Sequence, residues 1–218
     1  MTAAATPEAR WIDWLGSCAD SRRALRAFCP HYFYFSYCQI IAFSGLFTKV
    51  DPLDRQSLAE LGDVLHEELG RGQESRVHSR LFERFAAAVG LTPDDLRIDP
   101  TDVLPGVSRY VAELERAFGE GSRAQALAAY VFLETSAVDT YGPLVQVLIS
   151  LGYSAEDVEF FELHAGVEPE HAAAAEAMLQ RHGVAPEDPE ARAETEKLAE
   201  LWRAFWSEID QLCRNAVS

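Results

Sequence analysis

The chain has 218 residues, 48% of them hydrophobic, which is enough to bury one substantial core, and we expect a single domain over residues 1–218. Its 19 basic and 35 acidic residues give a net charge of −16, which argues against nucleic acid as a partner because no surplus of Lys and Arg exists to replace phosphate counterions. The four cysteines show no C-x-x-C spacing, so neither a zinc knuckle nor a disulfide framework is indicated.

The N-terminal residues MTAAATPEAR have neither the basic start nor the apolar run of a signal peptide, and we expect a cytoplasmic protein. The most apolar stretch, Tyr32 to Phe47, is interrupted by Ser36, Gln39 and Ser44 and is shorter than the ~20 residues that span a bilayer. It predicts a buried core helix and no membrane association.

Apolar residues recur at helical spacing along almost the whole chain, and no stretch alternates long enough to indicate a strand. The predicted fold class is therefore all-α. Ser122 and Ser154 are expected to be helix N-caps, and Gly183 is expected to follow a helix end. Pro and Gly residues divide the sequence into about eight segments, namely Pro7 to Phe28, Pro30 to Phe47, Leu53 to Leu69, Glu74 to Val89, Pro105 to Phe118, Ser122 to Leu151, Ala155 to Arg181 and Pro189 to Ala216.

The third and fourth segments meet in EELGRGQESRVHSRLF, where Glu68 ends one helix and His78 lies one turn into the next. His78 shares a helix face with Leu81, Phe82 and Phe85, so its imidazole is predicted to point toward the core. A single core histidine is usually just hydrogen-bonded. Here, however, other histidines and acids occur on separate helices.

The sixth segment carries Glu134 in the middle of an otherwise apolar run. Tyr130 and Tyr141 lie on the same helix face, four residues before and seven after this acid. A lone acid on the apolar side of a helix is costly unless it is paired, protonated or metal-bound. Glu134 is therefore a candidate ligand.

The seventh segment contains HAGVEPEH, in which His164, Glu168 and His171 occupy positions i, i+4 and i+7 of the expected helix. At about 100° per residue these three side chains fall within an arc of about 60°. Imidazoles and carboxylates without cysteine suit iron, manganese or zinc better than thiophilic ions. By itself the pattern is also compatible with a surface helix that happens to carry histidines among its acids.

Together these segments offer three carboxylates and three imidazoles, which can hold two divalent ions and leave positions open for dioxygen and substrate. The carboxylate bundles of the ferritin type use two Glu-x-x-His motifs, whereas here only Glu168 and His171 have that spacing. A ferritin-like bundle is thus disfavoured. The candidate metal ligands are Glu68, His78, Glu134, His164, Glu168 and His171.

The sequence from about Leu58 to His182 resembles the haem-oxygenase-like di-metal oxidases, often described as iron-containing redox enzymes. The resemblance rests on E-x-G-x-G-x-x-x-R-V-H-x-x-L-F at Glu68 to Phe82, a mid-helix Glu, and then H-x-x-x-(D/E)-x-x-H. It implies a haem-oxygenase-like bundle of about seven to eight helices. Glu168 is a departure, because Asp is usual at that position in the relatives.

The resemblance implies two Fe(II) ions, or manganese in their place, with dioxygen as co-substrate and an external reductant. One ion would be held by Glu68, His78 and His171, and the other by His164 and Glu168, with Glu134 shared. The expected reaction is hydrogen abstraction from carbon that leads to desaturation, fragmentation or ring closure of a small molecule, such as an aliphatic amino acid. A homodimer is a further possibility, since an apolar stripe of the last segment fits either core packing or an oligomer contact.

N-oxygenation of an amine is the first alternative, but N-oxygenases of this type tend to carry an extra carboxylate on the helix before the first ligand pair, and residues 31–47 contain no Asp or Glu.

For an amino-acid substrate, Arg76 is a candidate contact for the carboxylate and Asp139 or Tyr141 for the ammonium. Tyr37 belongs to the aromatic segment that is expected to line a dry substrate pocket.

Three other classes remain open from the sequence. A true haem oxygenase would need a proximal histidine in an early helix, for which His31 is the candidate. A thiaminase-like or quinone-cofactor enzyme of the same fold would work without metal, and a non-catalytic acidic module would bind none. His31, His66 and His182 are predicted not to be metal ligands, and the imidazoles of His66 and His182 are expected to be exposed near helix ends.

Overall fold

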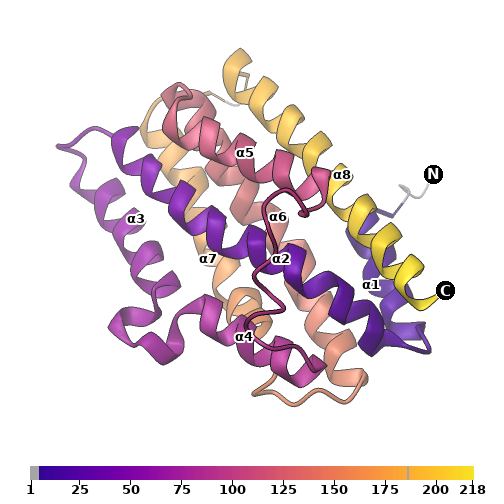
Figure 1. Ribbon diagram of the computed structural model, residues 1–218. Coiled ribbons are helices and arrows are strands. Elements are labelled where there is room, and N and C mark those ends of the chain that lie inside the picture. The colour runs from indigo at the N-terminus through magenta and orange to yellow at the C-terminus, as the bar shows by residue number, and fades with distance from the viewer. Residues whose placement is uncertain (1–4, 186) are drawn as a thin grey trace.

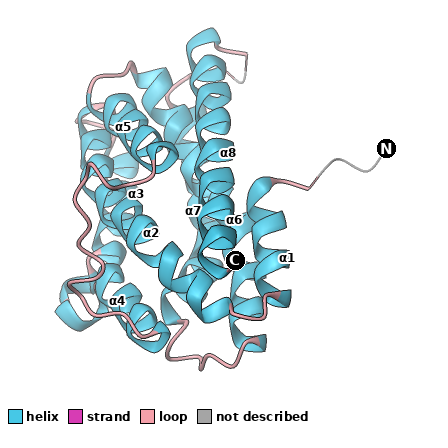
Figure 2. Ribbon diagram, turned by 45° about the vertical axis from the view of Figure 1, so that its right-hand side comes forward, coloured by secondary structure: helices cyan, strands magenta, loops and turns pink. Residues whose placement is uncertain are grey.

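The computed structural model describes residues 5–185 and 187–218, which form eight α-helices and three short 3₁₀ helices with no strand (Figures 1 and 2). The predicted all-α class is confirmed. The α-helices are α1 (Pro7–Ser17), α2 (Ser21–Phe43), α3 (Arg55–Glu68), α4 (His78–Val89), α5 (Pro105–Gly119), α6 (Arg123–Ser150), α7 (Glu159–Arg181) and α8 (Pro189–Val217). The 3₁₀ helices are Ser44–Thr48, Gly70–Gly72 and Glu74–Arg76.

The break predicted at Pro30 is wrong, because α2 continues through this residue. The first two helices are instead separated just before Ser21, where the Asp20 carboxylate accepts a hydrogen bond from the Arg23 backbone N–H and caps α2. A proline inside a helix costs ~3 kcal/mol, which the burial of aromatic side chains such as Phe28 and Tyr32 on both sides of it offsets.

Two of the three predicted helix-end signals are confirmed. Ser122 caps α6 through a reciprocal capping box with Gln125, and Gly183 follows α7 with a φ of +71°. Ser154 is not an N-cap, because its hydroxyl and backbone N–H bind the Asp157 carboxylate in a loop and α7 begins only at Glu159. Local pairing of Ser154 with Asp157 competes with helix initiation there.

The core is one contiguous cluster of apolar side chains contributed by all eight α-helices. Helices α6 and α7 make the most extensive contact, and α8 packs along α2, α5 and α6 before it ends beside α1 (Figure 1). Leu198, Trp202, Phe205 and Ile209 of α8 are buried, so the apolar stripe predicted in this segment belongs to the core.

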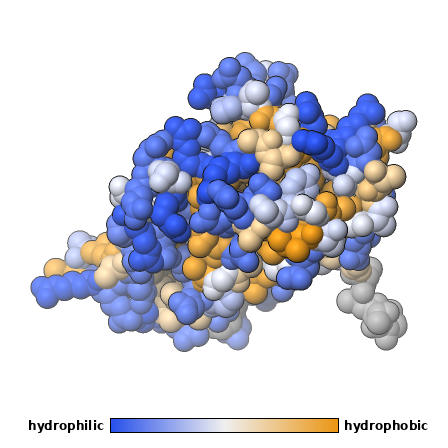
Figure 3. Space-filling view, turned by 90° about the horizontal axis from the view of Figure 1, so that it is seen from below, coloured by the Kyte–Doolittle hydropathy of each residue, from blue (hydrophilic) through white to orange (hydrophobic). Residues whose placement is uncertain are grey.

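No described helix is long and apolar enough to span a bilayer. On one face of the molecule, hydrophobic patches are surrounded by hydrophilic residues (Figure 3).

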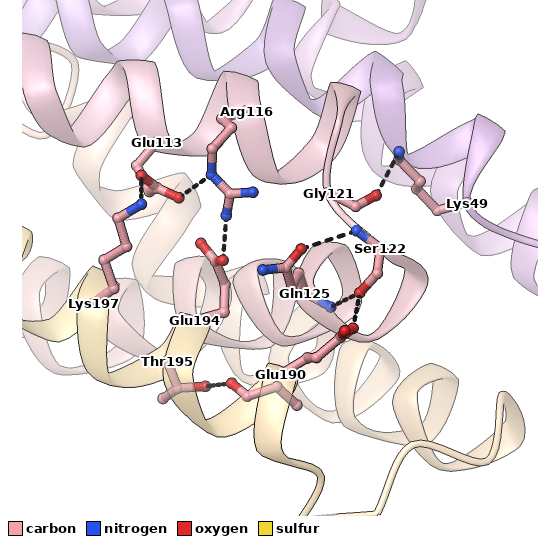
Figure 4. A network of polar contacts seen from close by, with 11 residues as sticks. Lys49, Glu113, Arg116, Gly121, Ser122, Gln125, Glu190, Glu194, Thr195 and Lys197 are labelled. Carbon is pink, nitrogen blue, oxygen red and sulfur yellow. Dashed lines mark hydrogen bonds and ion pairs between the residues drawn. The ribbon is translucent and has the colours of Figure 1, made fainter.

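Helices α5 and α8 are joined by a network of polar contacts around two buried carboxylates, those of Glu113 and Glu194 (Figure 4). Arg116 of α5 binds both Glu113 on its own helix and Glu194 on α8, and Lys197 also binds Glu113. Burial and the neighbouring Glu113 raise the pKa of Glu194, whose side chain is 2% exposed. Arg116 is thus the cation that allows two carboxylates to lie close together between these helices.

Replacing Arg116 by Met should destabilise the fold, because the substitution leaves two carboxylates without their main counter-charge. We expect a loss of about 3 kcal/mol, or roughly 6–12 °C in Tm. Arg203→Met is the matched control, because Arg203 lies exposed on α8. Equal melting temperatures for the two variants, measured by differential scanning calorimetry, would contradict this account.

Candidate metal centre

Four helices bring the six candidate ligands together. Glu68 is the last residue of α3, His78 is the first of α4, and Glu134 lies mid-way along α6. The other three candidates come from α7. The side chains form two groups, each able to offer three ligand atoms within 4.8 Å of one another. The first triad is Glu68, His78 and His164, and the second triad is Glu134, Glu168 and His171.

The turn between α3 and α4 positions the first two ligands. Gly70 has a φ of +69°, and a Cβ built on it would lie 2.5 Å from the backbone nitrogen of Val77. Only glycine therefore allows the chain to fold back so closely. The result is that the Nδ1 atom of His78 lies 2.9 Å from Oε2 of Glu68.

His164 completes the first triad from α7. Its Nδ1 atom lies 2.6 Å from the backbone carbonyl oxygen of Phe160, which can only accept a hydrogen bond. Nδ1 therefore carries the proton, and the Nε2 atom presents a lone pair 3.6 Å from Oε1 of Glu68. Backbone fixation of one ring nitrogen in this way is the usual arrangement of a metal-binding histidine.

The second triad combines two adjacent buried acids with one imidazole. The Nδ1 atom of His171 lies 3.7 Å from Oε2 of Glu134. Burial raises the pKa of Glu134, while burial together with the charge of Glu134 raises that of Glu168 well above its ordinary value. Carboxylate oxygens of Glu134 and Glu168 lie within 4.8 Å of each other, and two buried carboxylates so close together without a cation tend to retain a proton.

The first triad has the opposite electrostatic character. Burial would raise the pKa of Glu68, but the proximity of His164 and His78 outweighs burial and lowers it. Burial would likewise lower the pKa of His164, and the contact with Glu68 raises it instead. Glu68 is thus ionised and ready to act as a ligand.

Unpartnered atoms in both triads fit divalent metal ions. Among the described residues, the buried atoms without a hydrogen-bond partner include His78 Nδ1, His164 Nε2 and Glu168 Oε2. The 2.9 Å contact of His78 with Glu68 lacks hydrogen-bond geometry, so it leaves that nitrogen unsatisfied. Such groups are costly unless something binds them. Imidazole nitrogens and carboxylate oxygens are the donors that iron, manganese and zinc accept.

The grouping differs from the partition that the family resemblance implies. His164 lies with Glu68 and not with Glu168, whereas His171 lies with Glu134 and not with Glu68. His164 and His171 are separated by about two turns of α7, so they differ little in angle around the helix but by roughly 10 Å along its axis. This axial offset places the two histidines of α7 in different triads.

Glu67 is a functional candidate that the sequence analysis missed. Its Oε2 atom lies 3.0 Å from Nε2 of His171, and its other carboxylate oxygen pairs with Arg71. Glu67 can therefore accept a hydrogen bond from the Nε2–H of His171. This contact fixes the orientation of the imidazole so that the Nδ1 lone pair faces Glu134. The sequence shows Glu67 only as half of an i, i+4 pair with Arg71. Such pairs are common on exposed helices and do not indicate a role at a metal site.

The candidate substrate contacts lie in different places. The cavity beside the triads, defined here as the central cavity, has the triad carboxylates and Tyr141 in its wall, and it encloses about 580 Å³, part of it open to solvent. Arg76 lines a second cavity, whose wall includes His78. Tyr37 and Asp139 are exposed and line neither of these cavities.

The three histidines expected not to be ligands join neither triad. His66 is exposed, and Nδ1 of His31 accepts a hydrogen bond from the Leu104 backbone N–H at 3.3 Å. The expectation of an exposed imidazole is wrong for His182, whose side chain is 6% exposed. Its Nε2 atom lies 3.1 Å from the Asp54 carboxylate, which caps α3.

The family model described as iron-containing redox enzyme matches residues 40–206, which is most of the chain and includes all six triad residues. The chain belongs to the iron-containing redox enzyme family. No curated protein sequence is significantly similar to it. Membership of this family agrees with the resemblance found in the sequence and with the His and Glu triads.

Solved structures show the haem-oxygenase-like fold. A domain of unknown function with this fold from Shewanella denitrificans OS217 is 17% identical, with a TM-score of 0.72 over 91% of this chain and 82% of that one. A TenA homolog from Pseudomonas syringae pv. tomato DC3000 is 14% identical, with a TM-score of 0.72 over 96% and 88%. A TenA family transcription regulator from Silicibacter sp. TM1040 is 12% identical, with a TM-score of 0.62 over 98% and 90%.

Glu67→Ala should weaken metal binding at the second triad about 10- to 100-fold, since His171 loses the group that orients it. Glu67→Gln should retain most of the affinity, because its amide oxygen still accepts the Nε2 proton. Calorimetric titration with Zn(II) measures both sites, and Asp63→Ala, one turn earlier on the exposed side of α3, is the control. Unchanged binding in Glu67→Ala, or an equal loss at the first triad, would show that Glu67 does not position His171.

Metal affinity should rise with pH from the ordinary carboxyl range, near 4.5, until the proton retained by Glu134 and Glu168 is lost. The raised pKa values of Glu134 and Glu168 mean that the metal-free protein retains a proton that a metal ion must displace. Displacement of one proton makes binding about tenfold tighter per pH unit below that pKa. Calorimetry in two buffers of different ionisation enthalpy counts the protons released, and release of none across this range would contradict the prediction.

Proposed function

We propose that this member of the iron-containing redox enzyme family is a non-haem di-iron enzyme that uses dioxygen to oxidise a small organic molecule. The observation that carries the proposal is the pair of triads, which contain unpartnered nitrogen and oxygen atoms and whose three carboxylates line a cavity with largely apolar walls. Two Fe(II) ions held there would supply electrons for the reduction of dioxygen, and an external reductant would restore them. Manganese is compatible with the same donor atoms.

The protein would supply the negative charge and the ligand geometry of the metal centre. Three triad carboxylates offset most of the positive charge of two divalent ions, and the imidazoles bind as neutral ligands. Each triad supplies three protein ligands, which leaves coordination positions for dioxygen and substrate. The largely apolar walls of the central cavity reduce contact with water, which strengthens electrostatic interactions beside the triads.

Tyr32 and Tyr141 place a pair of phenols at the wall of this cavity. Their hydroxyl oxygens are 2.8 Å apart, and the Tyr141 ring lies 4.8 Å from the His164 ring. Burial raises the pKa of both phenols, so they remain protonated at neutral pH. Tyr141 is therefore a neutral hydrogen-bond donor beside the first triad, suited to orient a bound molecule there.

Hydrogen removal from carbon is the reaction that we favour. The wall contributed by α2 contains aromatic and aliphatic side chains and Gln39, with no carboxylate that could serve as the additional ligand typical of N-oxygenases. None of the four cysteines lines the central cavity, so the thiol needed by a thiaminase-like reaction is missing from it. Nδ1 of His31 accepts a hydrogen bond from the Leu104 backbone N–H, and His31 is not among the residues that line the central cavity, which disfavours a haem site there.

Glu134→Ala should abolish oxygen consumption and reduce the bound metal to one ion or fewer per chain. Glu134 is 6% exposed and supplies a ligand atom within 4.8 Å of those of Glu168 and His171, so its removal leaves the second triad with two ligands. Rates should fall more than about 100-fold, measured with an oxygen electrode after anaerobic Fe(II) loading.

Glu170→Ala is the control for this variant, because Glu170 is an exposed acid on α7 close to the same ligands. Metal content by elemental analysis accompanies each activity measurement. Retention of two irons and full oxygen consumption in Glu134→Ala would refute the assignment of the centre.

A further inference from the structure

Among the residues that the structure describes, none with a cationic side chain lines the central cavity. The charged residues in that wall are Glu68, Glu134 and Glu168, all of which belong to the triads. We propose that the substrate has an apolar body without a charged group and that Gln39 binds a neutral polar group on it. This inference rests on the proposed function and names the substrate class of the same site.

Charge complementarity argues against a zwitterionic substrate. A free amino acid brings a carboxylate and an ammonium, and each is costly to bury without an opposite charge. The guanidinium group of Arg76 lines the other cavity and lies 3.6 Å from Glu159, and Asp139 is exposed. Neither can neutralise an amino acid in the central cavity.

The remaining wall is suited to hydrocarbon. Phe35, Ile40 and Phe43 of α2 face the cavity together with Leu133 of α6 and Trp202 of α8. Apolar walls with a few polar groups are typical of sites for small organic ligands, and burial of each additional methylene strengthens binding about fourfold. Chain length should therefore raise affinity until the cavity is filled.

Beside the Tyr141 hydroxyl, Gln39 is the neutral polar group of the wall that can recognise a substrate. Its side-chain amide makes no hydrogen bond to any of the described residues. The hydroxyls of Ser136 and Thr140 donate to the backbone carbonyls of Leu133 and Ser136, each at 2.9 Å, and so offer only lone pairs. Gln39 can both donate and accept, which matches a hydroxyl, carbonyl or amide of the substrate.

Four six-carbon probes separate the possible charge states: hexanamide, hexylamine, hexanoate and norleucine. The protein is loaded with Zn(II), which accepts the same ligands without redox chemistry, and binding is measured by calorimetry without dioxygen. Hexanamide should bind at least tenfold more tightly than each of the other three probes, and heptanamide more tightly still. Tightest binding of norleucine or hexylamine would overturn the inference. Tightest binding of hexanoate, confined to the Zn(II)-loaded protein, would also overturn it, because the substrate would then be held through a carboxylate on the metal.

Two substitutions test Gln39 itself. Gln39→Leu should weaken hexanamide binding about tenfold and leave the binding of 1-chlorohexane unchanged, whereas Gln39→Glu should create binding of hexylamine. Gln73→Leu, in the exposed turn between α3 and α4, is the control. Unchanged hexanamide affinity in Gln39→Leu would overturn the role of this residue.

The two proposals fail separately. Failure of the protein to bind metal or consume dioxygen contradicts the proposed function. The order of the probes is measured by calorimetry and does not depend on turnover, so a different order in a protein that binds metal contradicts the inference about the substrate alone.

Discussion

The placement of three carboxylates and three imidazoles inside an apolar helical bundle is the constraint on which the rest of the structure depends. Glu134 and Glu168 are 6% and 5% exposed and lie next to each other, an arrangement that without a cation forces them to hold a proton. Elsewhere in the chain the same problem is solved by Arg116, which lies between Glu113 and Glu194. No Arg or Lys is among the residues around the triads in the central cavity, and a metal ion is the cation that suits them.

The helices meet this constraint by different means. The tight turn at Gly70 brings the end of α3 against the start of α4, and the 3.6-residue period of α7 directs three ligands to one side. α7 carries these ligands although Pro169 interrupts its hydrogen bonding, and its extensive contact with α6 offsets that cost. Activity in this view depends on the packing of α6 against α7.

Helical periodicity was sufficient to predict the all-α fold, and the residues that form the triads were evident because acids and histidines recur on otherwise apolar helix faces. Helix ends were less predictable, since Pro30 is tolerated inside α2 and Ser154 pairs with Asp157 instead of capping α7. Glu67 was missed because its partner, His171, is distant in sequence. The grouping into triads depends on how far each helix extends along its axis, which side-chain periodicity does not specify.

The central claim is that each triad binds one metal ion, and anomalous diffraction from crystals of the Mn(II)-loaded protein tests it most directly. The account predicts two peaks per chain, one among Glu68, His78 and His164 and the other among Glu134, Glu168 and His171. Absence of peaks at these side chains, or a single ion bound only elsewhere on the acidic surface, would contradict it.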